Sequence, residues 1–219
     1  MTDKQPITFN ALAIGLIWLF HVSGIIGILY GDSQWFVGAT PLNLSLSFVL
    51  LLWTSRHERK AFLVAFIAFV AGMVTEGLGV NYGLIFGHYI YGEALGWKVA
   101  GVPWLIGVNW SILTLCCGAI AANLADTFIS RVLLGVGLML LLDFVIEPIA
   151  PILDFWSFEG GIAPLQNYLG WFAVALPLHL LYQYMNVQIK GTFTHHLFLL
   201  QIVFFTLLLL QINTLQNAL

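Results

Sequence analysis

Charged residues are scarce in this chain of 219 residues, since Asp, Glu, Lys and Arg together make up only 8%. Soluble domains carry about 25% charged residues. With 60% hydrophobic residues and a mean hydropathy of +0.95, the chain lacks the polar residues that would cover a soluble surface. A net charge of −3 gives no basis for binding nucleic acid. The composition therefore predicts an integral membrane protein.

Cysteine is almost absent as well. The two cysteines, Cys116 and Cys117, are adjacent within an apolar run, a spacing that suits neither a disulfide nor a metal site. No small-residue cleavage pattern follows the first apolar run, so we expect no cleavable signal peptide.

Seven hydrophobic runs approach the ~20 apolar residues that a membrane-spanning helix needs. They lie near residues 11–30, 39–54, 61–80, 103–123, 132–152, 167–187 and 195–214. The second run is the weakest, because Pro41 and Asn43 interrupt its start, so six or eight spans are the alternatives. The segments between the runs are too short for a soluble domain. We predict an all-α integral membrane protein, one domain over residues 1–219, built as a bundle of about seven transmembrane helices.

The basic residues predict an orientation, because cytoplasmic loops carry an excess of Lys and Arg. With the N-terminus inside, Lys98 is the one basic residue of seven that falls on the outer side. The C-terminus then lies outside. Two long stretches rich in aromatic residues, Gly and Pro, residues 81–102 and 153–166, become outer loops.

Three carboxyl groups, Glu76, Asp143 and Glu147, lie in apolar runs that hold no Lys or Arg. An ionisable group inside a membrane is costly, so it faces a polar cavity, finds a partner or keeps a proton. Asp143 is near the middle of its run, and Glu147 follows one helical turn later on the same face. We expect the three to meet from two helices and one to serve as a general acid. The alternative is that each carboxyl only hydrogen-bonds a neighbouring helix.

Several familiar sites are missing. The glycine-rich stretch "EGLGVNYGLIFGHYIYG", residues 76–92, lacks the Gly-Lys-Ser/Thr of a phosphate-binding loop. The six histidines do not form the repeated pattern of a membrane di-iron oxygenase, and the last span has no lysine for a retinal Schiff base. No metal or cofactor is signalled. Gly79, Gly83 and Gly87 recur every four residues and predict a flat helical stripe for a neighbouring helix or a flat ligand.

Aromatic residues crowd both outer loops. Membrane-interface belts account for some of them, and the others suit a long apolar ligand. Aromatic faces also stabilise a cation where water is scarce. Pro148, directly after Glu147, either breaks a helix beside a cavity or simply ends the helix before the second loop.

Two stretches, "EGLGVNYGLIFGHYIYGEALGWKVAGVPWLIGVNW" and "LLDFVIEPIAPILDFWSFEGGIAPLQNYLGWFAVAL", resemble the CruF-like carotenoid biosynthesis family, which includes bisanhydrobacterioruberin hydratase. The resemblance covers about residues 70–185 and rests on the patterns G-x-x-F-G-x-Y-x-Y and N-x-x-G-W-F. Where the family often has Asp-Pro, this chain has Glu147-Pro148. The resemblance implies a membrane enzyme that adds water across the terminal C1′,C2′ double bond of an acyclic carotenoid, and it implies no cofactor.

That reaction needs a protonated acid, electron-rich walls and one water molecule. We predict Asp143 as the proton donor because it is the deepest carboxyl, and Glu76 or Glu147 as the group that orients and deprotonates water. Asp154 and His88 are weaker candidates. We expect aromatic and amide side chains to bind the substrate and the water, namely Tyr82, Phe86, Tyr89, Trp104, Trp156, Trp171, Asn81, Asn109 and Asn167.

The expected partners are a carotenoid like lycopene or γ-carotene, the lipid bilayer and other enzymes of the carotenoid pathway, with no nucleic acid. The expected location is the cytoplasmic membrane of a bacterium or archaeon. Two alternatives stay open: another carotenoid end-group enzyme such as a membrane lycopene cyclase, and a proton-coupled transporter, although no inverted repeat is evident.

Overall fold

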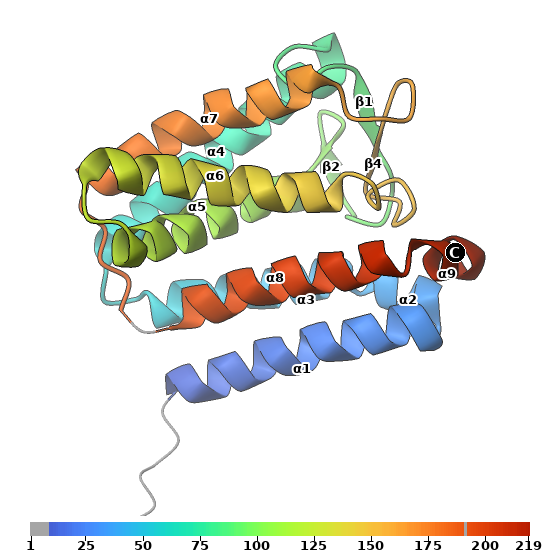
Figure 1. The fold of residues 1–219 in the computed structure, drawn as a ribbon, viewed down its shortest axis with the longest axis horizontal. Helices are drawn as coiled ribbons and strands as arrows, with labels where there is room; N and C mark the ends of the chain where they lie inside the picture. The colour runs from blue at the N-terminus through green and yellow to red at the C-terminus, as the bar shows by residue number, and fades with distance from the viewer. Residues whose placement is uncertain (1–8, 191) are drawn as a thin grey trace, which may run out of the picture.

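The computed structural model describes residues 9–190 and 192–219 and shows long helices running side by side (Figure 1). The long helices are α1 (Phe9–Tyr30), α3 (Thr40–Thr54), α4 (Arg59–Tyr82), α5 (Trp104–Leu124), α6 (Phe128–Ile146), α7 (Leu165–Tyr184) and α8 (Phe193–Leu210). Two short helices complete the set, α2 (Ser33–Gly38) and α9 (Ile212–Ala218). The prediction of an all-α membrane protein is confirmed.

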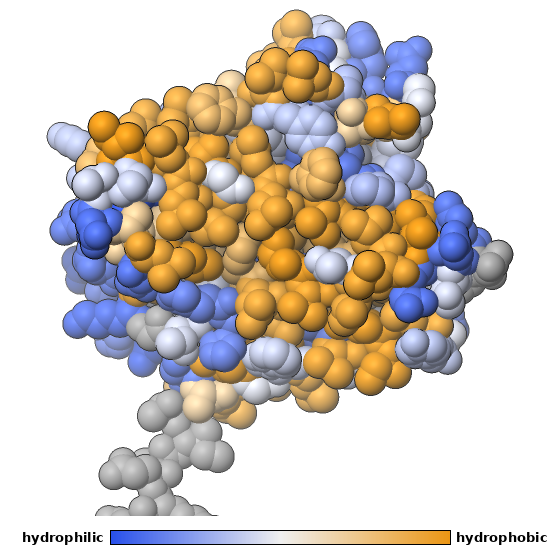
Figure 2. Space-filling model, in the orientation of Figure 1, coloured by the Kyte–Doolittle hydropathy of each residue, from blue (hydrophilic) through white to orange (hydrophobic). Residues whose placement is uncertain are grey.

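Six segments of the described chain are long and apolar enough to cross a membrane. One of them joins α2 and α3 into a span over Ser33–Thr54, so Pro41 lies in the first turn of α3 and does not prevent the span. Figure 2 shows a broad hydrophobic band across the helices, with hydrophilic residues gathered toward both ends. This distribution matches a protein surrounded by lipid at its middle.

Helix α7 is the seventh predicted span, and it is not among those six segments. Its sequence carries polar residues such as Asn167, His179 and Gln183, all of them buried. In Figure 1, α7 nevertheless runs alongside α4 and α6 and returns the chain from one end of the bundle to the other. Its polar side chains face the protein and lower the hydropathy of the helix, although the packing places it in the bundle.

Helix α5 forms the centre of the molecule. In its most apolar window, 89% of the residues are buried, against 22–39% in the other five spans. It packs against α3, α4, α6, α7 and α8. Helices α4 to α7 therefore form one group around α5, and α1, α3 and α8 lie together beside it (Figure 1).

The two predicted outer loops meet at one end of the bundle. Strand β1 (Tyr89–Tyr91) in the first loop pairs antiparallel with β4 (Trp156–Phe158) in the second, with Tyr89 opposite Phe158. A second small hairpin joins β2 (Lys98–Val99) to β3 (Val102–Pro103). Because side chains alternate along a strand, Tyr89 and Tyr91 are both buried while Ile90 is 68% exposed. The pair of β1 and β4, called the strand ribbon below, thus points two tyrosines toward the helices.

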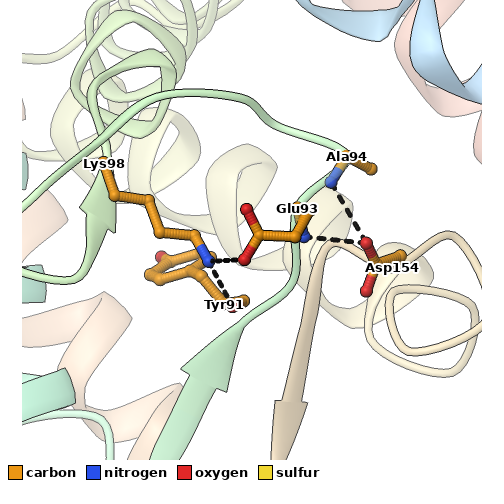
Figure 3. A network of polar contacts seen from close by, with 5 residues as sticks. All are labelled: Tyr91, Glu93, Ala94, Lys98 and Asp154. Atoms are coloured by element: carbon orange, nitrogen blue, oxygen red, sulfur yellow. Dashed lines mark hydrogen bonds and ion pairs between the residues drawn. The ribbon is translucent and has the colours of Figure 1, made fainter.

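A polar network fixes the end of this ribbon (Figure 3). The Lys98 ammonium donates to the Tyr91 carbonyl at 2.9 Å and forms an ion pair with Glu93 at 2.7 Å. The Asp154 carboxylate accepts from the backbone N–H groups of Glu93, at 2.7 Å, and of Ala94, at 3.2 Å. These contacts tie the two loops together next to the strand pair.

The basic residues separate between the two ends. Arg56, Arg59, Arg131 and Lys190 lie at the turns and helix starts opposite the strands, whereas Lys98 lies beside β1. Lys4 falls outside the described residues. The inside position of the N-terminus stays a prediction that rests on this charge separation.

The predicted glycine stripe is wrong. Helix α4 ends at Tyr82, and Gly83 closes it with a φ of +66°, a left-handed conformation that glycine adopts without strain. Gly87 has a φ of +96° in the loop beyond. Only Gly79 of the three belongs to the helix, so the spacing of four does not form a helical face.

Candidate functional site

A small cavity lies between the strand ribbon and the ends of α4, α5, α6 and α7. Its volume is about 30 Å³, room for roughly two water molecules at ~10–15 Å³ each. All three predicted carboxyl groups line it, together with aromatic and amide side chains. The lining residues are Glu76, Phe86, Tyr89, Tyr91, Ile106, Asn109, Trp110, Asp143, Glu147, Trp156, Phe158, Asn167 and Trp171.

Glu76 is held by three hydrogen-bond donors. Its Oε1 accepts from the Trp110 indole N–H at 3.0 Å. Its Oε2 accepts from the Tyr91 hydroxyl at 2.7 Å and from the Tyr89 hydroxyl. An indole N–H can only donate, so this contact fixes Oε1 as an acceptor. Glu76 is therefore the most firmly oriented carboxyl of the cavity.

The two tyrosines remain protonated donors. Burial, and then the nearby Glu76 charge, raise the pKa of the Tyr89 and Tyr91 hydroxyls well above the ordinary value. Both effects act in the same direction, because an apolar site and a neighbouring negative charge each disfavour a phenolate. The ribbon therefore supplies two neutral hydroxyl donors to the cavity throughout the physiological pH range.

Two glycines on α4 make room for the donors of Glu76. A Cβ atom at Gly72 would lie 2.5 Å from the Trp110 ring, and one at Gly79 would lie 2.7 Å from the Tyr89 oxygen. Both glycines share a helix face with Glu76, which stands four residues after one and three before the other. The spacing lets two aromatic side chains lie directly against the helix on either side of the carboxyl.

We expect Gly79→Ala to displace Tyr89 and weaken its hydrogen bond to Glu76. Overpacking of this kind costs about 1–3 kcal/mol of stability, and product formation should fall with it. The matched control is Gly77→Ala on the same helix, where nothing lies within 4 Å of the new methyl group. That control should be neutral or more stable by up to ~1 kcal/mol. Thermal unfolding in detergent measures both, and equal behaviour of the two variants would contradict the packing role of Gly79.

Asp143 and Glu147 form a pair of carboxyl groups. Asp143 lies in the last turn of α6, and Glu147 directly follows the end of the helix. The Asn167 amide donates to Asp143 Oδ2 at 3.0 Å and to Glu147 Oε1 at 3.1 Å. A single amide nitrogen from α7 therefore holds both of them in place.

Asp143 retains one free oxygen. No donor among the described residues reaches its Oδ1, although the side chain is 2% exposed. The residues around the cavity include no lysine or arginine, and within the described chain the three carboxyls do not form a group that could hold a metal ion. Asp143 Oδ1 is thus the carboxyl oxygen of the site that is available to a proton or a ligand.

The depth argument for Asp143 needs correction. Helix α6 starts at Phe128, where Thr127 and Ser130 form a capping box, and it ends at Ile146. Asp143 therefore lies in the last turn of its helix and not near the middle of a span over 132–152. Pro148 follows the helix end, so the helix-stop interpretation of this proline holds. The unpaired oxygen, not depth, now distinguishes Asp143 from Glu76.

Aromatic rings form most of the cavity wall. Trp110 stacks on Trp171 with ring centroids 4.4 Å apart and planes at 19°. Phe86 packs edge-on against Tyr89 at 6.4 Å, and Gly170 allows this because a Cβ there would meet Phe86 and the Ile85 carbonyl. Trp156 closes the remaining side and donates to Glu147 over 3.3 and 3.4 Å. These are the longest hydrogen bonds between side chains of the site, so the polar contact of Trp156 is the weakest of them.

Five predicted site residues lie away from the cavity. Asp154 braces the loop backbone as described above, and the Asn81 amide donates to the Gly77 and Ala100 carbonyls. His88 is exposed and its ring lies against Gly83. Tyr82 is 69% exposed and Trp104 38% exposed. We assign none of these five to the site.

Four cavity residues were not predicted: Tyr91, Trp110, Ile106 and Phe158. Tyr91 is two residues after Tyr89, so the alternation of a strand would have placed both tyrosines on one face. Trp110 lies inside an apolar span, where its N–H needs an acceptor, and Glu76 is one of few available. Ile106 and Phe158 carry no comparable signal in the sequence.

The fold and the cavity define the class of protein: a helical membrane protein with buried carboxyl groups facing an aromatic cavity. A family model described as "Carotenoid biosynthesis protein" matches residues 38–218, and this chain belongs to that family. The match is wider than the stretch of resemblance and includes every residue that lines the cavity. It supports a role as an enzyme of carotenoid biosynthesis. No match was found among curated proteins, and none among solved structures.

Proposed function

We propose that the protein is a carotenoid hydratase, which adds water across the terminal C1′,C2′ double bond of an acyclic carotenoid end. The observation that carries the proposal is the pair Asp143 and Glu147, held together by Asn167 in an aromatic cavity with room for about two waters. This pair offers an acid and a base side by side. Family membership supplies the class of substrate.

The reaction starts with a proton transfer to carbon. Asp143 Oδ1, the oxygen without a donor, gives its proton to C2′, and the electron pair of the double bond forms the new C–H bond. A tertiary cation remains at C1′. Two neighbouring carboxyl groups with no cation beside them resist double ionisation, which keeps a proton on the pair before the reaction.

The walls of the cavity suit this cation. Trp110, Trp171 and Trp156 line the cavity, and the faces of aromatic rings attract cations, Trp most strongly. The Glu76 carboxylate, oriented by its hydrogen bonds from Trp110 and Tyr91, adds a negative charge. Since these groups are in place before the reaction, they need little reorganisation when the charge appears.

Water then completes the addition. It forms a bond to C1′, and Glu147 accepts the proton that the bound water releases. Asn167 holds Glu147 beside Asp143, so this proton passes back to Asp143 and restores the starting state. Asn109 and Asn167 line the same space and supply amide groups that position the water. One water is consumed, one alcohol is formed, and no redox partner is required.

The proposal is tested by expressing the protein in a host without carotenoids of its own that carries the genes for lycopene or γ-carotene. We expect a more polar product whose mass exceeds that of the substrate by one water. An isomer of unchanged mass would instead identify a cyclase, which also begins by protonating an alkene. Unaltered pigment, with the protein inserted in the membrane, would overturn the enzyme proposal for these substrates and leave a transporter as the alternative.

A further inference from the structure

Four cavities follow one another from the carboxyl site to the outside of the bundle. A second cavity of about 60 Å³ shares Ile106, Asn109 and Trp156 with the carboxyl cavity. A third, also of about 60 Å³, shares Phe155, Gln201 and Phe205 with the second. A fourth of about 290 Å³ shares Thr40, Asn43 and Phe204 with the third. Each cavity therefore borders the next through common wall residues.

A continuous row of aromatic rings accompanies these cavities. Tyr91 contacts Trp156 at 6.2 Å between ring centroids, and Trp156 contacts Phe155 at 6.1 Å. The row continues from Phe155 to Phe205 at 6.5 Å and from Phe205 to Phe204 at 5.1 Å. It links the ribbon beside Glu76 to α8. A long conjugated chain can make stacked or edge-on contacts with such a row of rings along its whole length.

The fourth cavity opens where lipid surrounds the protein. Its walls come from α1, α2, α3 and α8, and they include Leu19, Trp35 and Leu42, which are 60%, 64% and 61% exposed. Of these helices, α8 lies beside α6 in Figure 1, and α1 lies on the other side of α8. Large apolar side chains exposed on a membrane protein face the hydrocarbon, so the mouth of the row faces the phase in which a carotenoid dissolves.

We propose that this row of cavities is the binding path of the polyene chain, which enters sideways from the bilayer between α1, α2, α3 and α8. The reacting end passes Trp156 and reaches the carboxyl cavity, while the rest of the chain lies along the aromatic row. This inference rests on the proposed function for the identity of the ligand. It explains how a cavity that holds only about two waters serves a long substrate: Trp156, whose side-chain hydrogen bonds to Glu147 are the longest of the site, moves aside for the end group.

The middle of the path also holds polar groups. Asn43 Oδ1 and Gln201 Oε1 have no hydrogen-bond partner among the described residues, and both side chains line the third cavity. A buried amide oxygen without a donor is costly. A water molecule beside the polyene satisfies such an oxygen, so these amides keep water near a route that is otherwise apolar.

The test uses Leu44→Trp, because Leu44 lines both the second and the third cavity. The matched control is Val49→Trp on the same helix, where the side chain is 58% exposed to the outside. Lycopene binding to the detergent-solubilised full chain is measured by the circular dichroism that a bound polyene acquires. We expect Leu44→Trp to weaken binding by about tenfold or more, a loss of ~1.4 kcal/mol, and Val49→Trp to bind as the unchanged protein does.

A second measurement does not depend on a bulky side chain. Thr40 borders the second, third and fourth cavities, so lycopene should slow the reaction of a small thiol reagent with Thr40→Cys. It should not slow the reaction with Val49→Cys. The native Cys116 and Cys117 are fully buried, and the unchanged protein gives their background.

The two proposals fail in different ways. Binding of lycopene that is lost in Leu44→Trp, without any hydrated product from the unchanged protein, supports the path and overturns the hydratase. Full lycopene binding by Leu44→Trp, with labelling of Thr40→Cys unaffected by lycopene, overturns the path even where the hydrated product forms.

Discussion

Asp143→Asn is expected to abolish most of the hydrated product while the protein still folds and binds the polyene. Loss of a general acid lowers a rate by about 10²–10⁴-fold, and an amide has no proton acidic enough to give to carbon. The shape of the site is kept, because the Asn167 amide can still donate to the remaining oxygen. Product is measured by chromatography and mass in the lycopene-producing host.

Asp154→Asn provides the matched control for this variant. Asp154 lies outside the cavity and accepts from two backbone N–H groups, which an amide oxygen also does. Its φ of +53° lies in the left-handed region, where Asn is tolerated well. We expect product formation close to that of the unchanged protein. Full product from Asp143→Asn would mean that another group donates the proton.

The sequence predicts the helices well because lipid imposes a simple requirement on them. A span must hide its backbone and expose apolar side chains, so six of the seven predicted runs appear as apolar helices. The positions where the helices start and end are predicted less accurately. The run over 132–152 is displaced because the capping pair Thr127 and Ser130, both polar, sets the start of α6, and hydropathy alone does not detect such a cap.

The carboxyl groups of the site are also predictable, because an unpaired Asp or Glu in an apolar run demands an explanation. What surrounds them is harder to predict. The strands β1 and β4 each have three residues, too few for a clear alternation, and their pairing joins loops about seventy residues apart. The tyrosines that hold Glu76 therefore enter the site through a contact that only the tertiary structure specifies. Asp154 and His88 are the opposite case: both are weaker candidates from the sequence and both lie away from the cavity, since loop polarity alone does not indicate a site.

Glu76→Gln removes the negative charge of the most firmly oriented carboxyl and nearly keeps its shape, so it should separate the effect of charge from the effect of packing. The amide oxygen of the variant can take the place of Oε1 and accept from Trp110, while its amide nitrogen donates to the hydroxyls of Tyr89 and Tyr91. Tyrosine hydroxyls accept as well as donate, so both contacts can persist with their direction reversed. The two hydroxyl protons then lose the carboxylate oxygen as their acceptor, so stability should fall, but by less than when the polar group is removed altogether. The negative charge that stabilises the cation is lost, and product formation should fall by about 10²–10³-fold, as when other oriented electrostatic groups are removed.

Glu76→Leu is the contrasting variant. It leaves the Trp110 N–H and two tyrosine hydroxyls without their acceptor in a buried site, and each unpaired group costs about 1–3 kcal/mol. Thermal unfolding in detergent should show a larger loss for Glu76→Leu than for Glu76→Gln. If Glu76→Gln is both stable and fully active, Glu76 only joins the ribbon to the helices, and the aromatic rings alone stabilise the cation. If it is stable and inactive, the carboxylate charge is part of the chemistry, because the variant keeps a polar contact to Trp110, Tyr89 and Tyr91.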